Sequence, residues 1–177
     1  MYRMGQEEVD AVARVVKSGE LFRIASKNHE VDNFEKELAE KVGVEYALFL
    51  TGGTTALLTG LMGLGVGPGD EVIVPAYTFM ASAMAVIAVG AIPVIAECDE
   101  TLGLDPDDIE RKISPHTKAI IPVHMLGLPC DMDRIMDVAN RHGLKVMEDS
   151  CQAVGGSYKG KRLGTIGHAG AYSFNYY

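Results

Sequence analysis

The fold is decided by residues 69–99, which read GDEVIVPAYTFMASAMAVIAVGAIPVIAECD. Two short apolar runs, residues 71–74 and 93–96, flank an apolar segment at residues 79–88 that is long enough for a helix. Runs of this length with almost continuous Val, Ile and Ala are typical of parallel strands buried on both faces. The stretch therefore predicts a strand–helix–strand unit.

The same alternation extends along most of the chain. We predict further strands at residues 46–50, 119–123 and 144–147, and further helices at residues 54–64, 107–112 and 132–142. Asp105 precedes a proline and Asp131 precedes an apolar helical pattern, so each is expected to cap a helix. The predicted fold class is α/β, with a mostly parallel sheet covered by helices.

Two amphipathic helices precede this alternating region. Apolar residues recur at helical spacing in residues 9–16 and again in residues 31–42, and Gly19 and Gly43 are expected to end the two helices. Residues 21–29 show no clear period and are expected to be irregular.

Composition limits the possible functions. The 177 residues are 47% hydrophobic and 23% charged, which excludes disordered, collagen-like and coiled-coil proteins. A net charge of -8 with no basic cluster argues against nucleic-acid and anionic-membrane surfaces, and no apolar run is long enough to cross a bilayer. Cys98, Cys130 and Cys151 form no C-x-x-C pair, so we expect no metal site and a cytoplasmic location.

Ligands of parallel sheets collect beyond the carboxyl ends of the strands. The first such end reads TGGTTA at residues 51–56, where two glycines and the start of a helix would suit a phosphate. A tight turn with Thr54 as helix cap is the alternative. The loop is neither a Walker loop nor a G-x-G-x-x-G fingerprint, which disfavours a nucleotide-binding Rossmann protein.

Two more strand ends carry polar residues. Asp149 ends a buried strand, where a carboxylate needs a cation or several donors, and a helix cap or a salt bridge would also satisfy it. The third strand end is at residues 169–173, where residues 172–175 close another expected strand, and Ser173 could be a turn residue or a second phosphate donor.

Six short motifs follow one another along the chain: Gly53-Thr54-x-Ala56-Leu57, Pro75-x-x-Thr78-Phe79, Val123-His124, Glu148-Asp149-x-x-Gln152, Tyr158-Lys159-Gly160 and Ser173-Phe174. Taken in this order, they resemble the DegT/StrS family of sugar aminotransferases, which are pyridoxal-phosphate enzymes of fold type I. It covers nearly the whole chain.

The resemblance implies a role for each matched position. Gly53, Thr54 and Ser173 would hold the phosphate of pyridoxal 5'-phosphate. Phe79 would pack on the pyridine ring, Gln152 would bond near the phenolic oxygen, and Asp149 would pair with the ring nitrogen. Arg23 and His124 are candidate substrate contacts, with a solvated arginine and a structural histidine as the alternatives.

The resemblance also implies features beyond these residues. The Schiff-base lysine would follow Ser173 by five residues, at position 178. The sequence is expected to be interrupted at this modified lysine, and a fragment of a longer chain is the alternative. Residues 1–30 would form an N-terminal helix and substrate-site segment, and residues 31–177 an incomplete large domain that a small C-terminal domain follows. The protein would be a homodimer that binds neither nucleic acid nor membranes.

The implied reaction moves an amino group from glutamate or glutamine to a keto-sugar, possibly a nucleotide-linked one. Two alternatives stay open. Relatives with histidine in place of the lysine are sugar dehydratases, so residue 178 would distinguish the two activities. A catalytically silent protein that binds the cofactor and has a regulatory role is the other alternative.

Overall fold

The structure is a computed structural model of the chain, and it describes residues 4–25, 27 and 29–175. Contacts within the chain define two compact units. One comprises Met1–Phe49 with Asn175–Tyr177, and the other comprises Leu50–Phe174. The functional division proposed after residue 30 stays a prediction, because the contacts divide the chain after Phe49.

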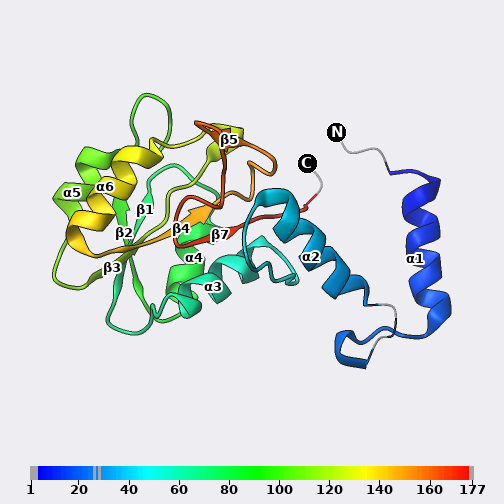
Figure 1. Cartoon of the computed structure of the whole chain (residues 1–177). Helices are drawn as coiled ribbons and strands as arrows, with labels where there is room; N and C mark the ends of the chain where they lie inside the picture. The colour runs from blue at the N-terminus through cyan, green and yellow to red at the C-terminus, as the bar shows by residue number, and fades with distance from the viewer. Residues whose placement is uncertain (1–3, 26, 28, 176–177) are drawn as a thin grey trace. The chain divides into compact units, whose positions relative to one another are not determined.

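The larger unit contains a five-stranded sheet in which every neighbouring pair of strands is parallel, in the order β2-β1-β3-β4-β7 (Figure 1). The strands are β1 (Glu71–Pro75), β2 (Ile92–Ala96), β3 (Thr117–Ile120), β4 (Lys145–Asp149) and β7 (Ala169–Ala171). The helices are α3 (Gly53–Gly63), α4 (Ala81–Ala88), α5 (Pro106–Lys112) and α6 (Met132–His142), with a 3-10 turn, η2, at Met125–Gly127. This arrangement confirms the predicted fold class.

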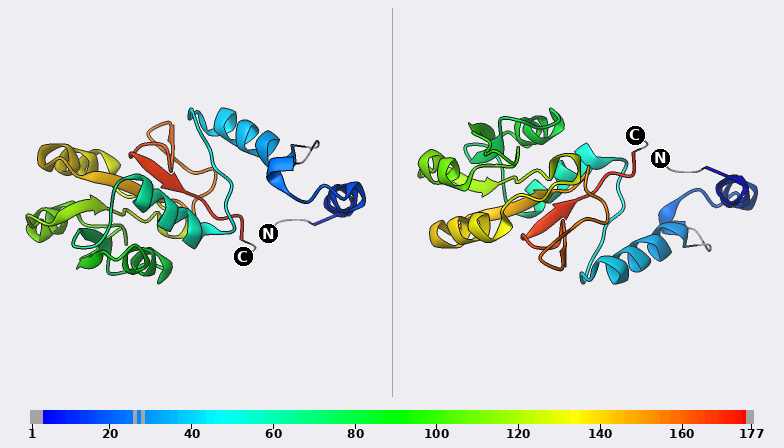
Figure 2. Two further views of the ribbon diagram at one scale, coloured as in Figure 1. Left: turned by 90° about the horizontal axis from the view of Figure 1, so that it is seen from below. Right: turned by 90° about the horizontal axis from the view of Figure 1, so that it is seen from above.

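The sheet has a separate core on each face. Val72 and Val74 of β1 pack in the cluster that includes residues of α3 and α4, whereas Ile73 packs in the cluster that includes residues of α5 and α6. The alternation follows from the strand geometry, because successive side chains point to opposite faces. Figures 1 and 2 show α5 beside α6 and α3 beside α4. The two layers of helices explain why the strands read as continuous apolar runs.

The predicted helix caps are confirmed. The Asp105 carboxylate accepts a hydrogen bond from the N–H of Asp107 at the start of α5. The Asp131 carboxylate accepts one from the N–H of Arg134 at the start of α6. Each cap satisfies an amide that has no partner within its helix.

The smaller unit contains α1 (Gln6–Ser18), a 3-10 turn η1 (Arg23–Ala25) and α2 (Glu30–Val42). Gly19 and Gly43 end the two α-helices in the left-handed conformation, with φ of 70° and 82°, as predicted. The aromatic rings of Phe34 and Phe49 meet edge to face, with centroids 4.8 Å apart.

The strand predicted at residues 46–50 is wrong, because no ladder of the described chain includes this segment. A strand forms only where a neighbour takes its backbone hydrogen bonds, and here the N–H of Phe49 donates to the Glu35 carboxylate. The strand predicted at residues 119–123 occurs as Thr117–Ile120. Pro122 offers no N–H to continue the ladder, although Val123 still forms an isolated bridge with Asp149.

A short antiparallel hairpin was not predicted from the sequence. It pairs β5 (Ser157–Tyr158) with β6 (Lys161–Arg162), in a segment that the sequence analysis did not assign to a strand. No helix among the described residues has both the length and the apolar character to cross a membrane.

Candidate functional site

The carboxyl end of the sheet brings Gly53, Cys151 and Ser173 together. A Cβ atom added to Gly53 would lie 2.7 Å from Cys151 Sγ and 3.0 Å from Ser173 Cβ. The first distance is shorter than real Cβ contacts and the second is tighter than most of them, so the start of α3 comes close enough to Cys151 and Ser173 to require a glycine. Two of the predicted phosphate positions, Gly53 and Ser173, are therefore adjacent.

The first turn of α3 offers backbone donors at this place. The first hydrogen bond within the helix runs from the N–H of Ala56 to the carbonyl of Gly52, and no side chain of the described chain caps the helix start. Thr54 is exposed, and its first turn carries no acidic residue. Among the described residues, the amides that precede Ala56 in this 11-residue helix have no hydrogen-bond acceptor, and together with the positive end of the helix dipole they favour an anion.

Asp149, the last residue of β4, lies at the same end of the sheet and is 6% exposed. Its Oδ2 accepts a hydrogen bond of 2.8 Å from the Ser82 hydroxyl, and its Oδ1 accepts one of 3.2 Å from the N–H of Cys151. In the part of the chain that the structure describes, Asp149 forms no ion pair. A buried carboxylate with neutral donors and no cation is a suitable partner for a cationic ring nitrogen.

Phe79 stands in the turn before α4, and its side chain is 60% exposed. Its carbonyl lies 3.3 Å from the hydroxyl of Ser82, the residue that contacts Asp149. The turn that carries this open aromatic ring is thus linked to the carboxylate through one side chain.

Gln152 follows Asp149 in the loop after β4. Its side-chain oxygen accepts a hydrogen bond of 3.2 Å from the N–H of Leu126. The opposite end of the amide carries the NH₂ group, which has no hydrogen bond within residues 4–25, 27 and 29–175. Gln152 can therefore offer donors to a ligand oxygen while its carbonyl is held by the protein.

Glu148 and His124 form a buried pair, and both side chains are fully inaccessible. Glu148 accepts hydrogen bonds from the N–H groups of Gly164, Ile166 and Gly167 at 2.6 to 2.8 Å. Burial raises the pKa of Glu148, but the hydrogen bonds from His124 and from the backbone outweigh burial and place the pKa below its ordinary value. The pair fixes the loop after β6 against the end of β4.

His124 has no ring nitrogen left for a substrate. Its Nδ1 accepts from the N–H of Cys130 at 3.2 Å, so Nε2 carries the proton and donates to Glu148 at 3.1 Å. The structure thus favours the structural alternative over the substrate contact suggested for His124.

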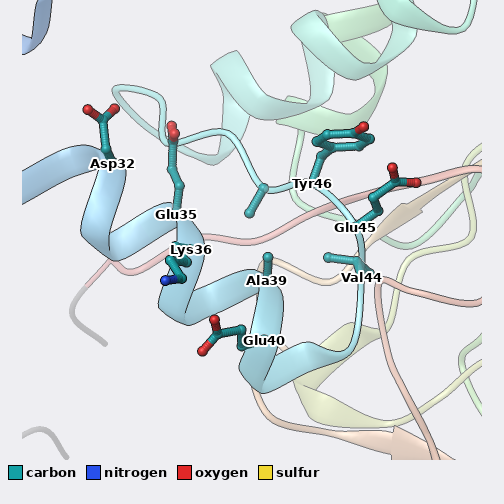
Figure 3. A pocket seen from close by; sticks show the side chains of 9 residues that line it. Asp32, Glu35, Lys36, Ala39, Glu40, Val44, Glu45 and Tyr46 are labelled. Atoms are coloured by element: carbon teal, nitrogen blue, oxygen red, sulfur yellow. The ribbon is translucent and has the colours of Figure 1, made fainter.

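Arg23 lies in the smaller unit, within η1. Its guanidinium pairs with Asp32 at 3.3 Å and with Glu35 at 2.6 Å. Both carboxylates line a hollow between α2 and the segment that follows it, which Figure 3 shows. The other charged residues of this hollow are Lys36, Glu40 and Glu45, so its lining is mainly acidic. The substrate role of Arg23 stays a prediction.

Sequence reasoning missed Ser82 and the backbone contacts of Glu148. Ser82 occupies an apolar helix start where serine is usually a cap, so its residue type gave no signal. Glu148 precedes Asp149 directly, and the alternation of strand side chains could have placed it on the opposite face. No group of three or more His, Cys, Asp or Glu residues in the described chain could hold a metal.

These residues fit pyridoxal phosphate on structural grounds. The uncapped start of α3, next to Ser173, would take the phosphate, and the buried carboxylate of Asp149 would take a protonated ring nitrogen. Phe79, in the turn before α4, supplies an exposed aromatic ring, and Gln152, in the loop after β4, supplies amide donors.

Comparison with known proteins identifies the family to which the chain is similar. The DegT/DnrJ/EryC1/StrS aminotransferase family matches residues 2–177. The spore coat polysaccharide biosynthesis protein SpsC of Bacillus subtilis is 45% identical over 172 residues, which is 97% of this chain and 43% of that protein. The dTDP-3-amino-3,4,6-trideoxy-alpha-D-glucose transaminase of Streptomyces venezuelae is 43% identical over 98% of this chain and 45% of its own length.

Solved structures of aminotransferases also superpose closely on this chain. An aminotransferase from Psychrobacter cryohalolentis superposes with a TM-score of 0.93 at 44% identity, over 97% of this chain and 43% of that chain. The ntda protein of Bacillus subtilis, solved with bound cofactor PMP, superposes with a TM-score of 0.80 at 38% identity, over 88% of this chain and 35% of its own. The chain spans less than half the length of each of these proteins.

Proposed function

Because the chain belongs to the DegT/DnrJ/EryC1/StrS aminotransferase family, we propose that the protein is a pyridoxal-phosphate-dependent sugar aminotransferase. The single observation that carries the proposal is the Asp149 carboxylate, which is buried, bonded to two neutral donors and without an ion pair among the described residues. It lies at the same sheet end as the uncapped start of α3.

When bound, pyridoxal phosphate supplies an electron sink that stabilises the carbanion left when a substrate loses a proton. The residues of this chain would position that sink. The first-turn amides of α3 and the Ser173 hydroxyl would bind the phosphate, and Gln152 would donate to the phenolic oxygen. Phe79 would cover the ring, and Asp149 would hold a proton at the ring nitrogen, where positive charge strengthens electron withdrawal.

The proposed substrates are a keto-sugar, most simply a nucleotide-linked one, and glutamate or glutamine as amine donor. Support comes from the names of relatives, which include a dTDP-amino-sugar transaminase and an L-glutamine:2-deoxy-scyllo-inosose aminotransferase. A cytoplasmic location is proposed because Cys98, Cys130 and Cys151 are all free thiols.

The cofactor is tested by the absorbance spectrum of the purified full-length protein. We expect a cofactor band that borohydride reduction abolishes, with the cofactor retained on the protein afterwards. A protein that stays colourless after addition of pyridoxal phosphate would refute the proposal.

The role of Asp149 is tested by Asp149→Asn, which keeps the shape of the side chain and removes its charge. We expect cofactor binding to persist, because the phosphate contacts are intact, and kcat to fall about a hundredfold or more, because the ring nitrogen loses its ionic partner. Turnover near the wild-type value would show that another carboxylate has this role.

The residue at position 178 distinguishes the aminotransferase from the dehydratase. We expect lysine there, five residues after Ser173, and mass spectrometry of the borohydride-reduced tryptic peptide would find the cofactor attached to it. Histidine at this position would favour the dehydratase activity.

A further inference from the structure

Ser82 connects the turn before α4 to the carboxylate of Asp149. Its side chain is fully buried in the first turn of the helix, and its Oγ lies 2.8 Å from Asp149 Oδ2. The Oγ1 atom of Thr78 lies 2.8 Å from Ser82 Oγ on the other side. Two hydroxyls therefore form a chain of hydrogen bonds that ends on the Asp149 carboxylate.

The direction of these bonds follows from counting protons. Ser82 has one hydroxyl proton and two acceptors in reach, the Asp149 carboxylate at 2.8 Å and the Phe79 carbonyl at 3.3 Å. The charged and closer acceptor takes the proton. Ser82 Oγ is then free to accept, so Thr78 donates to it at 2.8 Å in preference to the Phe79 carbonyl at 3.2 Å. Hydroxyls linked in one direction polarise each other and strengthen the final bond.

The two donors to Asp149 bind different oxygens. Ser82 holds Oδ2, and the N–H of Cys151 holds Oδ1. A carboxylate held on both oxygens cannot rotate about its terminal bond without breaking one of them. If the Ser82 hydroxyl is removed, Oδ2 is left buried without its donor, and the carboxylate turns or draws in water to replace it.

We propose that Ser82, supported by Thr78, is a positioning residue that fixes the Asp149 carboxylate in the orientation needed to keep a proton on the ring nitrogen of the cofactor. The inference rests on the proposed function and deepens it, because it assigns the orientation of Asp149 to two linked hydroxyls, Ser82 on α4 and Thr78 in the turn before that helix. Small displacements of a group that contacts the reacting system cost large factors in rate.

The test compares Ser82→Ala with Ser150→Ala in the full-length protein. Ser150 is an equally buried serine next to Asp149, and its hydroxyl has no hydrogen-bond partner among the residues that the structure describes. Both variants lose one buried oxygen, but only Ser82→Ala removes a donor to Asp149. The first readout is the ¹⁵N NMR shift of the ring nitrogen of bound, ¹⁵N-labelled pyridoxal phosphate, followed over pH. The second is the division of the effect between kcat and KM.

We expect the ring nitrogen of Ser82→Ala to lose its proton at lower pH than in the wild type. We also expect kcat to fall about tenfold or more with KM changed less than about threefold, the effect of losing one hydrogen bond to a charged group. Ser150→Ala should match the wild type in both readouts. Thr78→Val should give a smaller change of the same kind, and Thr78→Ser should restore the wild-type values. Thr78→Val also provides the test if Ser82→Ala does not fold.

The outcomes separate the two proposals. Wild-type protein that takes up no pyridoxal phosphate would overturn the proposed function, and this inference with it. Wild-type protein with a protonated ring nitrogen, together with an unchanged ¹⁵N signal and kcat in Ser82→Ala or in Thr78→Val, would overturn the inference alone. A loss of thermal stability without a change in the ¹⁵N titration would mean that the hydroxyl has only a structural role.

Discussion

Gly53 stands where any side chain would collide with two neighbours. A Cβ at this position would meet Cys151 Sγ at 2.7 Å and Ser173 Cβ at 3.0 Å, so the need for glycine is one of space. We expect Gly53→Ala to weaken binding of pyridoxal phosphate at least about tenfold and to cost about 1–3 kcal/mol of stability, as overpacking does. Fluorescence titration with the cofactor and urea unfolding would measure the two effects.

Gly63 gives the matched control, because it lies in the same helix and a Cβ there would meet nothing within 4 Å. Gly63→Ala should leave cofactor affinity unchanged and raise helix stability by up to about 1 kcal/mol. Equal affinities for the two variants would contradict a cofactor phosphate at the start of α3.

The lowered pKa of Glu148 should make the free energy of unfolding depend on pH. Its pKa is lowered from 4.5 because, although burial raises it, the hydrogen bonds from His124, Gly167 and Gly164 together have the larger effect. A lowered folded-state pKa means that this contribution to stability is complete above pH 4.5 and is lost as the pH falls through the folded-state pKa. Glu148→Gln should lower the free energy of unfolding by about 3 kcal/mol at pH 7, because the substitution leaves several buried donors without a charged acceptor.

The measurement is urea unfolding of wild type and Glu148→Gln at pH 7, 4.5 and 3. The difference in unfolding free energy should be constant down to about pH 4.5 and should shrink below it. Two parallel curves over the whole range would show that Glu148 is not the titrating group.

Helix α5 shows how one side chain at an element's end contributes to stability. Its seven residues follow Asp105, whose carboxylate accepts from the N–H of Asp107 at 2.9 Å. Asp105→Ala should lower the free energy of unfolding by about 1 kcal/mol, and Asp105→Ser should lose much less because serine is also a good cap. Chemical denaturation would measure both. An alanine variant as stable as the serine variant would mean that the cap bond contributes nothing.

Elements were predictable from the sequence wherever local signals decide them. The helices predicted at residues 54–64, 107–112 and 132–142 agree with α3, α5 and α6 to within one residue at each end, and for α5 and α6 the capping aspartate directly precedes the helix in the sequence. The strand expected at residues 46–50 depended on a neighbour, which local sequence does not reveal. The β5–β6 hairpin is two residues per strand, too short for any periodic pattern.

The candidate site was predictable to a similar degree. The rule that ligands bind at the carboxyl ends of parallel strands pointed to the edge of the sheet where Gly53 and Ser173 lie side by side. The contact from Ser82 to Asp149 joins residues 67 positions apart, and only the three-dimensional packing of α4 on the sheet creates it. His124 illustrates the converse, because a residue at a strand end can be turned into the core.

At the scale of the whole molecule, large apolar side chains beside the candidate site are uncovered. Phe79 and Met80 in the turn before α4 are 60% and 65% exposed, and Met84 and Ile87 on the helix are 53% and 61% exposed. The same helix carries Ser82, which contacts Asp149. An apolar patch next to a site that must exclude water is expected to be covered.

We expect a second copy of the protein to cover this patch, in an obligate homodimer that buries more than about 2,000 Å² in total. Met84→Glu places a charge in the patch and should shift sedimentation of the full-length protein from dimer towards monomer, with loss of activity because the site then admits water. Lys118→Gln is the control, since it changes the charge by the same amount at an exposed position of β3 and should leave the dimer intact. Wild-type protein that sediments as a fully active monomer would refute the dimer. The apolar residues beside Asp149 would then face water in the active enzyme, and no second copy would be needed to cover them.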